Sequence, residues 1–174
     1  QTMPWSVRED LLEEFGYEMP KSLKEYYELM LDWEDSYAAD NTDYTFDENL
    51  VSDDSQKRLM AVSNAMQTYA MTYEEPGQPL SFDSLAFREV LEVIEQLPYE
   101  TPDADANMAI TSAMTLGAEQ KSIFNSYAYD VFGQYASDDP DAAKPTLMAP
   151  VPFAEGDDPQ MFAYMTVFVL NPNS

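Results

Sequence analysis

Apolar residues recur at helical spacing through the first hundred residues and give way to short apolar runs further along the chain. A spacing of three or four residues predicts helices over residues 7–15, 22–37, 53–73 and 84–97. Runs rich in aromatic and β-branched residues predict short strands near residues 108–114, 146–151 and 162–170. A further short strand is expected before the first helix, near residues 2–6. The pattern therefore predicts an α/β fold, rich in helix, with one small sheet and a single domain over residues 1–174.

The boundaries of the first two helices carry specific signals. Gly16 directly follows the first predicted helix, at the position where a helix commonly ends in a residue of left-handed conformation. Pro20 breaks the chain, Ser22 is a good N-cap, and Glu25 completes a capping box. We expect the second helix to bury five large residues, namely Leu23, Tyr26, Tyr27, Met30 and Trp33.

The third and fourth helices are connected by a proline- and glycine-rich turn at residues 75–79. The fourth helix is expected to be capped by Asp83 or Ser84. Inward positions in the third helix are predicted at Leu59, Val62, Ala65, Met66, Tyr69 and Ala70. Inward positions in the fourth are predicted at Phe87, Val90, Leu91 and Ile94. Residues 39–51 are predicted to be a polar connection, and residues 119–132 fit either a helix or an irregular segment.

The balance of charge narrows the range of partners. Eight basic and 33 acidic side chains give a net charge of −25. A field of that sign repels phosphate backbones and anionic lipid surfaces, so we expect no binding to nucleic acid or to membrane surfaces. No apolar stretch reaches the roughly 20 residues that a membrane-spanning helix needs. The 45% hydrophobic content is too high for a disordered segment.

The chain contains no cysteine and no histidine. Their absence removes disulfides, thiolate nucleophiles, zinc–thiolate sites and the commonest general base. We therefore predict no catalytic residue, no cofactor and no metal site. Two alternatives stay open. Three acidic clusters, near residues 40–48, 103–105 and 138–141, could hold calcium, although none has the spacing of a calcium-binding loop. A pair of carboxylates could hydrolyse a glycan, although among 33 acidic residues such a pair carries little information.

Three aromatic residues fit no apolar stripe, namely Trp5, Tyr127 and Tyr129. They lie near predicted junctions of strand and loop, where a ring can stack on the apolar face of a sugar. Ordinary packing in the core is the alternative interpretation of each.

Three segments together resemble one family. Residues 7–30 read VREDLLEEFGYEMPKSLKEYYELM, and residues 82–88 read FDSLAFR. Residues 148–174 contain a proline-rich segment, an acidic glycine turn and a strand that ends in NPNS. In this order the segments resemble the bacterial extracellular solute-binding proteins of ABC importers, specifically the sugar-binding type.

The resemblance implies a two-lobed protein of the type II periplasmic-binding-protein-like fold, which binds solute by hinge closure. This chain would be its second, more helical lobe, with the first lobe and the C-terminal helices lying outside it. The implied role is non-enzymatic: capture of a carbohydrate and its delivery to a membrane permease. We then expect an extracytoplasmic location, at the cell surface or in the periplasm. A lipid anchor is expected upstream, and a monomeric state is expected too.

The resemblance also nominates ligand-binding residues. The loop after the strand at residues 108–114 would face the cleft, which nominates Thr115, Glu119 and Gln120. Trp5 would stack on a sugar, and Tyr127 is a further candidate. Two other functions stay open: a cell-surface interaction domain that has lost transport, and a carboxylate-dependent glycan hydrolase.

Overall fold

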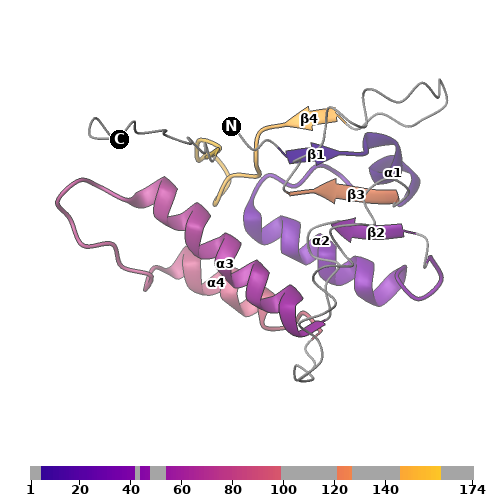
Figure 1. The fold of residues 1–174 in the computed structure, drawn as a ribbon, viewed down its shortest axis with the longest axis horizontal. Coiled ribbons are helices and arrows are strands. Elements are labelled where there is room, and N and C mark those ends of the chain that lie inside the picture. The colour runs from indigo at the N-terminus through magenta and orange to yellow at the C-terminus, as the bar shows by residue number, and fades with distance from the viewer. Residues whose placement is uncertain (1–4, 42–43, 48–53, 99–120, 127–145, 162–174) are drawn as a thin grey trace, which may run out of the picture.

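The computed structural model describes residues 5–41, 44–47, 54–98, 121–126 and 146–161 (Figure 1). Within these ranges the helices are α1 (Glu9–Glu14), α2 (Leu23–Ser36), α3 (Asp54–Tyr73) and α4 (Leu85–Ile94). The strands are β1 (Trp5–Val7), β2 (Tyr44–Asp47), β3 (Lys121–Asn125) and β4 (Thr146–Met148). The predicted α/β class, with several helices and one small sheet, is confirmed. None of the described helices is both long and apolar enough to cross a membrane.

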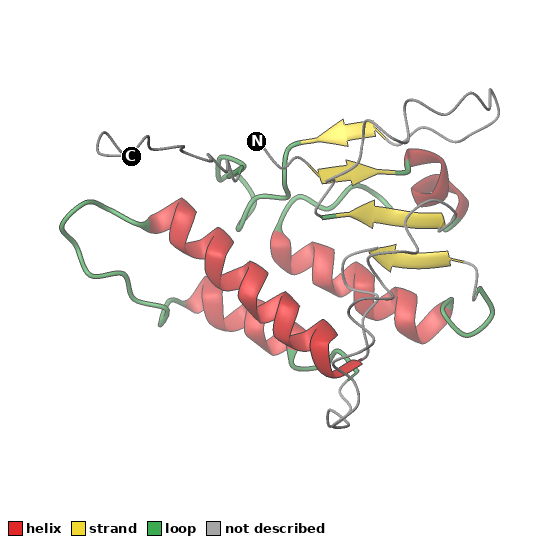
Figure 2. Ribbon diagram, in the orientation of Figure 1, coloured by secondary structure: helices red, strands yellow, loops and turns green. Residues whose placement is uncertain are grey.

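The four strands form one mixed sheet in the order β2-β3-β1-β4. Strand β1 is antiparallel to both β3 and β4, with Ser6 opposite Asn125 and Leu147, whereas β2 is parallel to β3. Figure 2 shows α2 running along the sheet, with α3 and α4 side by side further from it. Three layers therefore follow one another, namely the sheet, α2 and the α3–α4 pair.

The predicted strands are confirmed only in part. Strand β1 overlaps the predicted strand at residues 2–6, and β4 is the first part of that at 146–151. The strands predicted at residues 108–114 and 162–170 lie outside the described residues. The other two observed strands were not predicted. Strand β2 falls in the expected polar connection, and β3 falls where a helix or irregular segment was expected. Both are too short to show a period. They are strands because of their pairing in the sheet, β2 with β3 and β3 also with β1.

The first two helices follow their predicted signals. Gly16 has a φ of 74°, and the N–H groups of Gly16 and Tyr17 donate to the carbonyls of Glu13 and Leu12, a Schellman ending for α1. Ser22 Oγ accepts from the N–H of Glu25 at 3.2 Å. The Glu25 carboxylate accepts in return from the N–H of Lys21 at 2.7 Å. All five residues predicted to face inward in α2 are buried.

Helix α3 buries only part of its predicted inward face: Ala65 and Tyr69 are buried as predicted, and Val62 is partly buried against the core. Leu59 is 68% exposed and Met66 is 43% exposed, so the prediction that they face inward was wrong. Among the residues of this helix whose side chains the structure describes, Ala61 and Thr68 are also buried, and neither was predicted to face inward. The hydroxyl of Tyr27 donates to the carbonyl of Ala61 at 3.1 Å, so α2 approaches the α3 backbone closely. Small alanines permit that approach, and it decides which face is buried.

Helix α4 largely follows its predicted stripe. The N-cap is Ser84, and Phe87, Val90 and Ile94 are buried as predicted. Leu91 is only partly buried, and Val93 is buried in addition.

The ring of Tyr26 lies at the centre of the contact between α2 and the sheet. It contacts Trp5, Phe46 and Phe124 from three different strands, with ring centroids 5.1 to 5.3 Å apart. Its hydroxyl donates to Asp47 Oδ2, a carboxylate that is itself buried and that also accepts from the N–H of Ser126 at 3.3 Å. Burial first, and then the charge of Asp47, raises the pKa of Tyr26 well above its usual value.

Candidate functional site

The residues predicted to bind a ligand do not form a site in the described part of the chain. Thr115, Glu119, Gln120 and Tyr127 lie outside the described residues, as does the aromatic residue Tyr129. Trp5 is described and is 4% exposed, with its ring 5.1 Å from that of Tyr26. A ring that stacks on a sugar needs an open face, so the observed role of Trp5 is packing in the core. Ligand binding by Thr115, Glu119, Gln120 and Tyr127 stays a prediction.

The acidic clusters proposed for calcium can be compared with the structure at two residues. Asp47 is buried and bonded to the Tyr26 hydroxyl, so it belongs to the core and not to a solvent-facing loop. Asp40 lies in a turn, where its N–H donates to the carbonyl of Tyr37. Across the described ranges, no three acidic side chains gather as metal ligands. The remaining members of the clusters lie outside those ranges.

A hollow of about 260 Å³ opens where α3 passes into α4, and we call it the α3–α4 hollow. Its lining residues come from the end of α3 and the loop that follows, and they are Tyr69, Tyr73, Glu75, Gln78, Pro79, Leu80 and Ser81. This volume lies just below the usual range for ligand pockets, about 300–1,000 Å³, and suits a small molecule or one group of a larger molecule.

The loop beside the hollow is shaped by its proline and glycine. The N–H of Gln78 donates to the carbonyl of Glu75 at 3.1 Å and closes a four-residue turn. Gly77 has a φ of 80°, a value that favours glycine at the third position of a type II turn with proline before it. This turn places Glu75 and Gln78 at the edge of the hollow.

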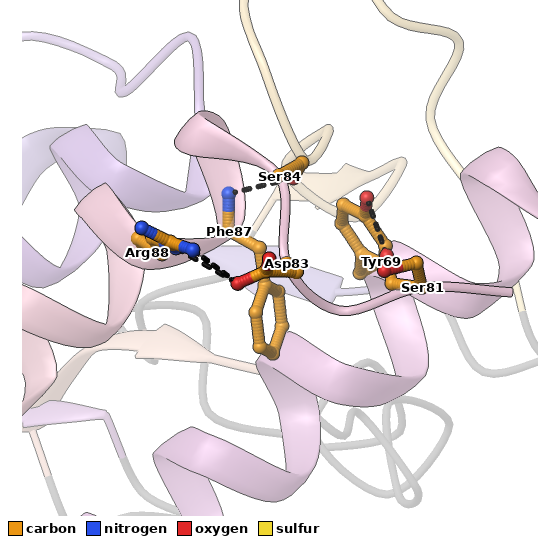
Figure 3. A network of polar contacts seen from close by, with 6 residues as sticks. All are labelled: Tyr69, Ser81, Asp83, Ser84, Phe87 and Arg88. Atoms are coloured by element: carbon orange, nitrogen blue, oxygen red, sulfur yellow. Dashed lines mark hydrogen bonds and ion pairs between the residues drawn. The ribbon is translucent and has the colours of Figure 1, made fainter.

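One aromatic cluster supports the wall of the hollow. The ring of Tyr69 contacts four other rings, with centroids 4.7 to 5.5 Å apart, and those belong to Tyr73, Phe82, Phe87 and Phe153. Its hydroxyl donates to the carbonyl of Ser81 at 3.1 Å, which joins the loop to α3 (Figure 3). Tyr73 and Phe82 are each 37% exposed, so the cluster reaches the surface.

The start of α4 fixes the far end of the same loop. Ser84 Oγ accepts from the N–H of Phe87 at 3.1 Å, a standard N-cap (Figure 3). The Arg88 guanidinium pairs with Asp83, with Nε 3.1 Å from Oδ1. Both side chains are largely exposed, so the ion pair adds little stability, whereas the cap sets where the helix begins.

Tyr73 joins the hollow to the segment that follows β4. Its hydroxyl donates to Asp157 Oδ2 at 2.5 Å, and the same oxygen accepts from the N–H of Ala154 at 3.0 Å. Burial and this hydrogen bond raise the pKa of Tyr73 to about 12, so its phenol stays neutral at physiological pH. The ring is thereby held in one orientation at the edge of the hollow.

A second hollow, of about 160 Å³, lies between α2 and β2. Lys57 Nζ lies 2.6 Å from Glu34 Oε1 beside it, and both charges are largely covered. The Thr45 hydroxyl is buried here without a hydrogen-bond partner. This hollow is smaller than the first, and the charges that line it already include a paired lysine and glutamate. The α3–α4 hollow is therefore the stronger candidate.

The sequence analysis did not predict this hollow, because residues 75–79 were interpreted only as the turn that ends the third helix. A signal was present: Tyr69 and Tyr73 lie one helical turn apart and directly precede the proline–glycine turn. That spacing places two rings on one face at a helix end, although only the packing of Phe153 and Phe82 shows that they border a hollow.

In comparisons with known proteins, no protein-family model, no curated protein and no solved structure matches this chain.

Proposed function

We propose that this chain is the second lobe of an extracytoplasmic solute-binding receptor of an ABC importer, which captures a carbohydrate and passes it to a membrane permease. In this role the chain is a binding module and performs no catalysis. The ligand would lie between this lobe and a first lobe, and the candidate contacts remain Thr115, Glu119, Gln120 and Tyr127.

The observation that carries the proposal is the packing of the three resemblance segments against one another. The N–H of Leu23, in the first segment, donates to the carbonyl of Pro152 in the third at 2.8 Å. The rings of Phe87 and Phe153, from the second and third segments, stack with centroids 6.1 Å apart and planes 16° from parallel. Segments that resemble one family in the same order are expected to meet if they form one lobe of that family.

A ligand screen of the two-lobed receptor tests the proposal. We expect one mono- or oligosaccharide to raise the melting temperature saturably and to bind in calorimetry, because closure of the lobes around a ligand stabilises the closed state. The isolated chain is the matched control and should bind the same sugar far more weakly, since it offers one wall of the cleft. Absence of any sugar binding by the receptor, with flanking sequence unrelated to a first lobe, would refute the proposal.

A further inference from the structure

Helix α3 presents one apolar stripe to the surface. Leu59 is 68% exposed and Met66 is 43% exposed. Ser63 is exposed as well, and Ala70 is partly exposed. These positions follow one another at steps of four, three and four residues, so they lie along one side of the helix. Helix α3 belongs to the layer furthest from the sheet (Figure 1), and we call this stripe the α3 seam.

The α3 seam is uncharged on a strongly charged protein. The sequence has no acidic or basic residue from Leu59 to Tyr73, whereas 24% of the whole chain is charged and its net charge is −25. The centres of protein–protein interfaces are depleted of charge in the same way. A second copy of the chain can therefore approach along α3 without setting carboxylate against carboxylate.

Large and small side chains alternate along the seam. In an antiparallel pair of α3 helices, Leu59 lies beside Ala70 of the partner subunit, and Met66 lies beside Ser63 of the partner subunit. Each large side chain then meets a small one. A parallel pair would set large against large and small against small, which leaves voids. The Ser63 hydroxyl can donate to a carbonyl one turn back in its own helix, so the seam can bury it.

The two ends of α3 are complementary in charge. The basic residues of this helix, Lys57 and Arg58, lie near its start, and Glu74 and Glu75 directly follow its last residue. The helix dipole adds partial positive charge at the start and partial negative charge at the end. In an antiparallel pair the start of each helix lies beside the end of the other. Both ends of the seam therefore favour a second copy in this orientation.

We infer that the chain forms a symmetric dimer in which the α3 seams of two copies pack antiparallel. The inference does not rest on the proposed sugar receptor, and it departs from the monomeric state that the resemblance implies. The seam spans about three helical turns, which is small beside the roughly 1,200 Å² that a stable interface buries. We therefore expect a weak, reversible dimer.

Sedimentation equilibrium of the purified chain measures the association. We expect the mass to rise from one copy toward two as the concentration increases. The dimer should tighten when salt is added, because salt screens the repulsion between two copies of net charge −25.

Two variants locate the contact. Met66→Glu places two carboxylates close to the two-fold axis and should weaken the dimer at least about thirty-fold. Met19→Glu is the matched control, because it makes the same exchange at a side chain of similar exposure, 39%, in the loop between α1 and α2. The control should change the affinity by less than about two-fold. Unfolding curves establish that both variants fold.

Disulfide crosslinking tests the orientation independently, since the chain has no cysteine of its own. A mixture of Leu59→Cys and Ala70→Cys chains should give the mixed crosslink, because these two positions lie opposite each other in the antiparallel pair. Each variant alone should crosslink poorly. Its two equivalent positions lie about 16 Å apart along the helix axis, which is beyond the reach of a disulfide.

Four outcomes would overturn the inference. The first is a chain that stays monomeric up to millimolar concentration at high salt. The second is equal weakening by Met66→Glu and Met19→Glu, which would place the contact elsewhere. The third is crosslinking of each cysteine variant with itself and no mixed product, which would indicate a parallel pair. The fourth is association that weakens with salt, which would indicate contact between opposite charges. Failure of the sugar screen of the receptor would leave these results unaffected.

Discussion

The contact of α2 with the sheet and the end of the α3–α4 pair are both built around a tyrosine surrounded by other rings. At the first, Tyr26 is completely buried and its hydroxyl is bonded to a buried carboxylate. At the second, Tyr69 is bonded to a backbone carbonyl, and its neighbours Tyr73 and Phe82 reach the surface.

The difference lies in what covers each cluster. Strands β1, β2 and β3 cover Tyr26, so the rings of this cluster have no free face for a ligand. A turn and one loop border Tyr69, and a hollow remains beside it. Similar aromatic composition therefore gives a sealed core in one place and, in the other, a cluster whose outer rings, Tyr73 and Phe82, reach the surface. Exposure of the rings decides between these roles, whereas their number does not.

The largest expected effect separates the two regions by truncation of a ring. Phe124→Ala removes a fully buried ring that packs against Tyr26 with centroids 5.3 Å apart, and it should lower the free energy of unfolding by about 3–5 kcal/mol. Phe82→Ala, at the end of the α3–α4 pair, should lower the free energy of unfolding by only about 1 kcal/mol, since that ring is partly exposed. Urea unfolding measures both. Equal losses would contradict the contrast between a sealed and an open cluster.

A smaller effect is expected when only the hydroxyl is removed. Tyr26→Phe leaves the buried Asp47 without its phenol donor, so stability should fall by about 1–3 kcal/mol. Tyr69→Phe leaves the carbonyl of Ser81 without its phenol donor. Because Ser81 is exposed, water can replace that donor, and stability should fall by about 1 kcal/mol or less. Chemical denaturation of the two variants side by side tests this order. A larger loss in Tyr69→Phe would reverse our interpretation.

The start of α4 gives a further, smaller difference. Ser84→Ala removes the cap on the N–H of Phe87 and should cost about 1 kcal/mol. Asp83→Ala removes the exposed partner of Arg88 and should cost less than about 0.5 kcal/mol. Thermal unfolding at low and high salt distinguishes them, because only the ion pair is screened. A strongly salt-dependent loss in Ser84→Ala would contradict its role as a cap.

The smallest effect is confined to alkaline pH. Tyr26 and Tyr73 both have a folded-state pKa above the unfolded value near 10. Their contribution to stability is therefore complete below pH 10 and is lost as the pH rises toward the folded-state pKa, which is about 12 for Tyr73, because the unfolded chain releases these protons first. In ultraviolet titration of the folded protein, Tyr73→Phe should remove one group that ionises near pH 12. Tyr26→Phe should leave the curve unchanged until the protein unfolds. Ionisation of Tyr26 alongside the exposed tyrosines would show that its cluster is not sealed.

Several parts of the fold follow from local chemistry and were predictable. Ser22 with Glu25, Gly16 and Ser84 set the ends of three helices through hydrogen bonds within a few residues, so their sequence signals suffice. The buried side of α2 followed in the same way, because its large residues form a single stripe.

The rest depended on contacts between distant segments. Strands β2 and β3 are too short to have a period of their own, and each is a strand because the other lies beside it. Helix α3 carries more than one set of apolar residues, and its close approach to Tyr27 at Ala61 selected the set that is buried. The aromatic cluster beside the α3–α4 hollow likewise forms only where Tyr69 meets Phe153, which is 84 residues further along the chain.

The sequence by itself thus determined the helices, their caps and the acidity of the surface, because each depends on residues close together in the chain or on composition alone. Tertiary structure decided which aromatic residues are sealed and which border a hollow. That choice depends on how many elements close over each ring, and no local pattern specifies it. Trp5 illustrates the point: its position at a strand end suggested a ring open to a sugar, and the strands and α2 around it bury the ring instead.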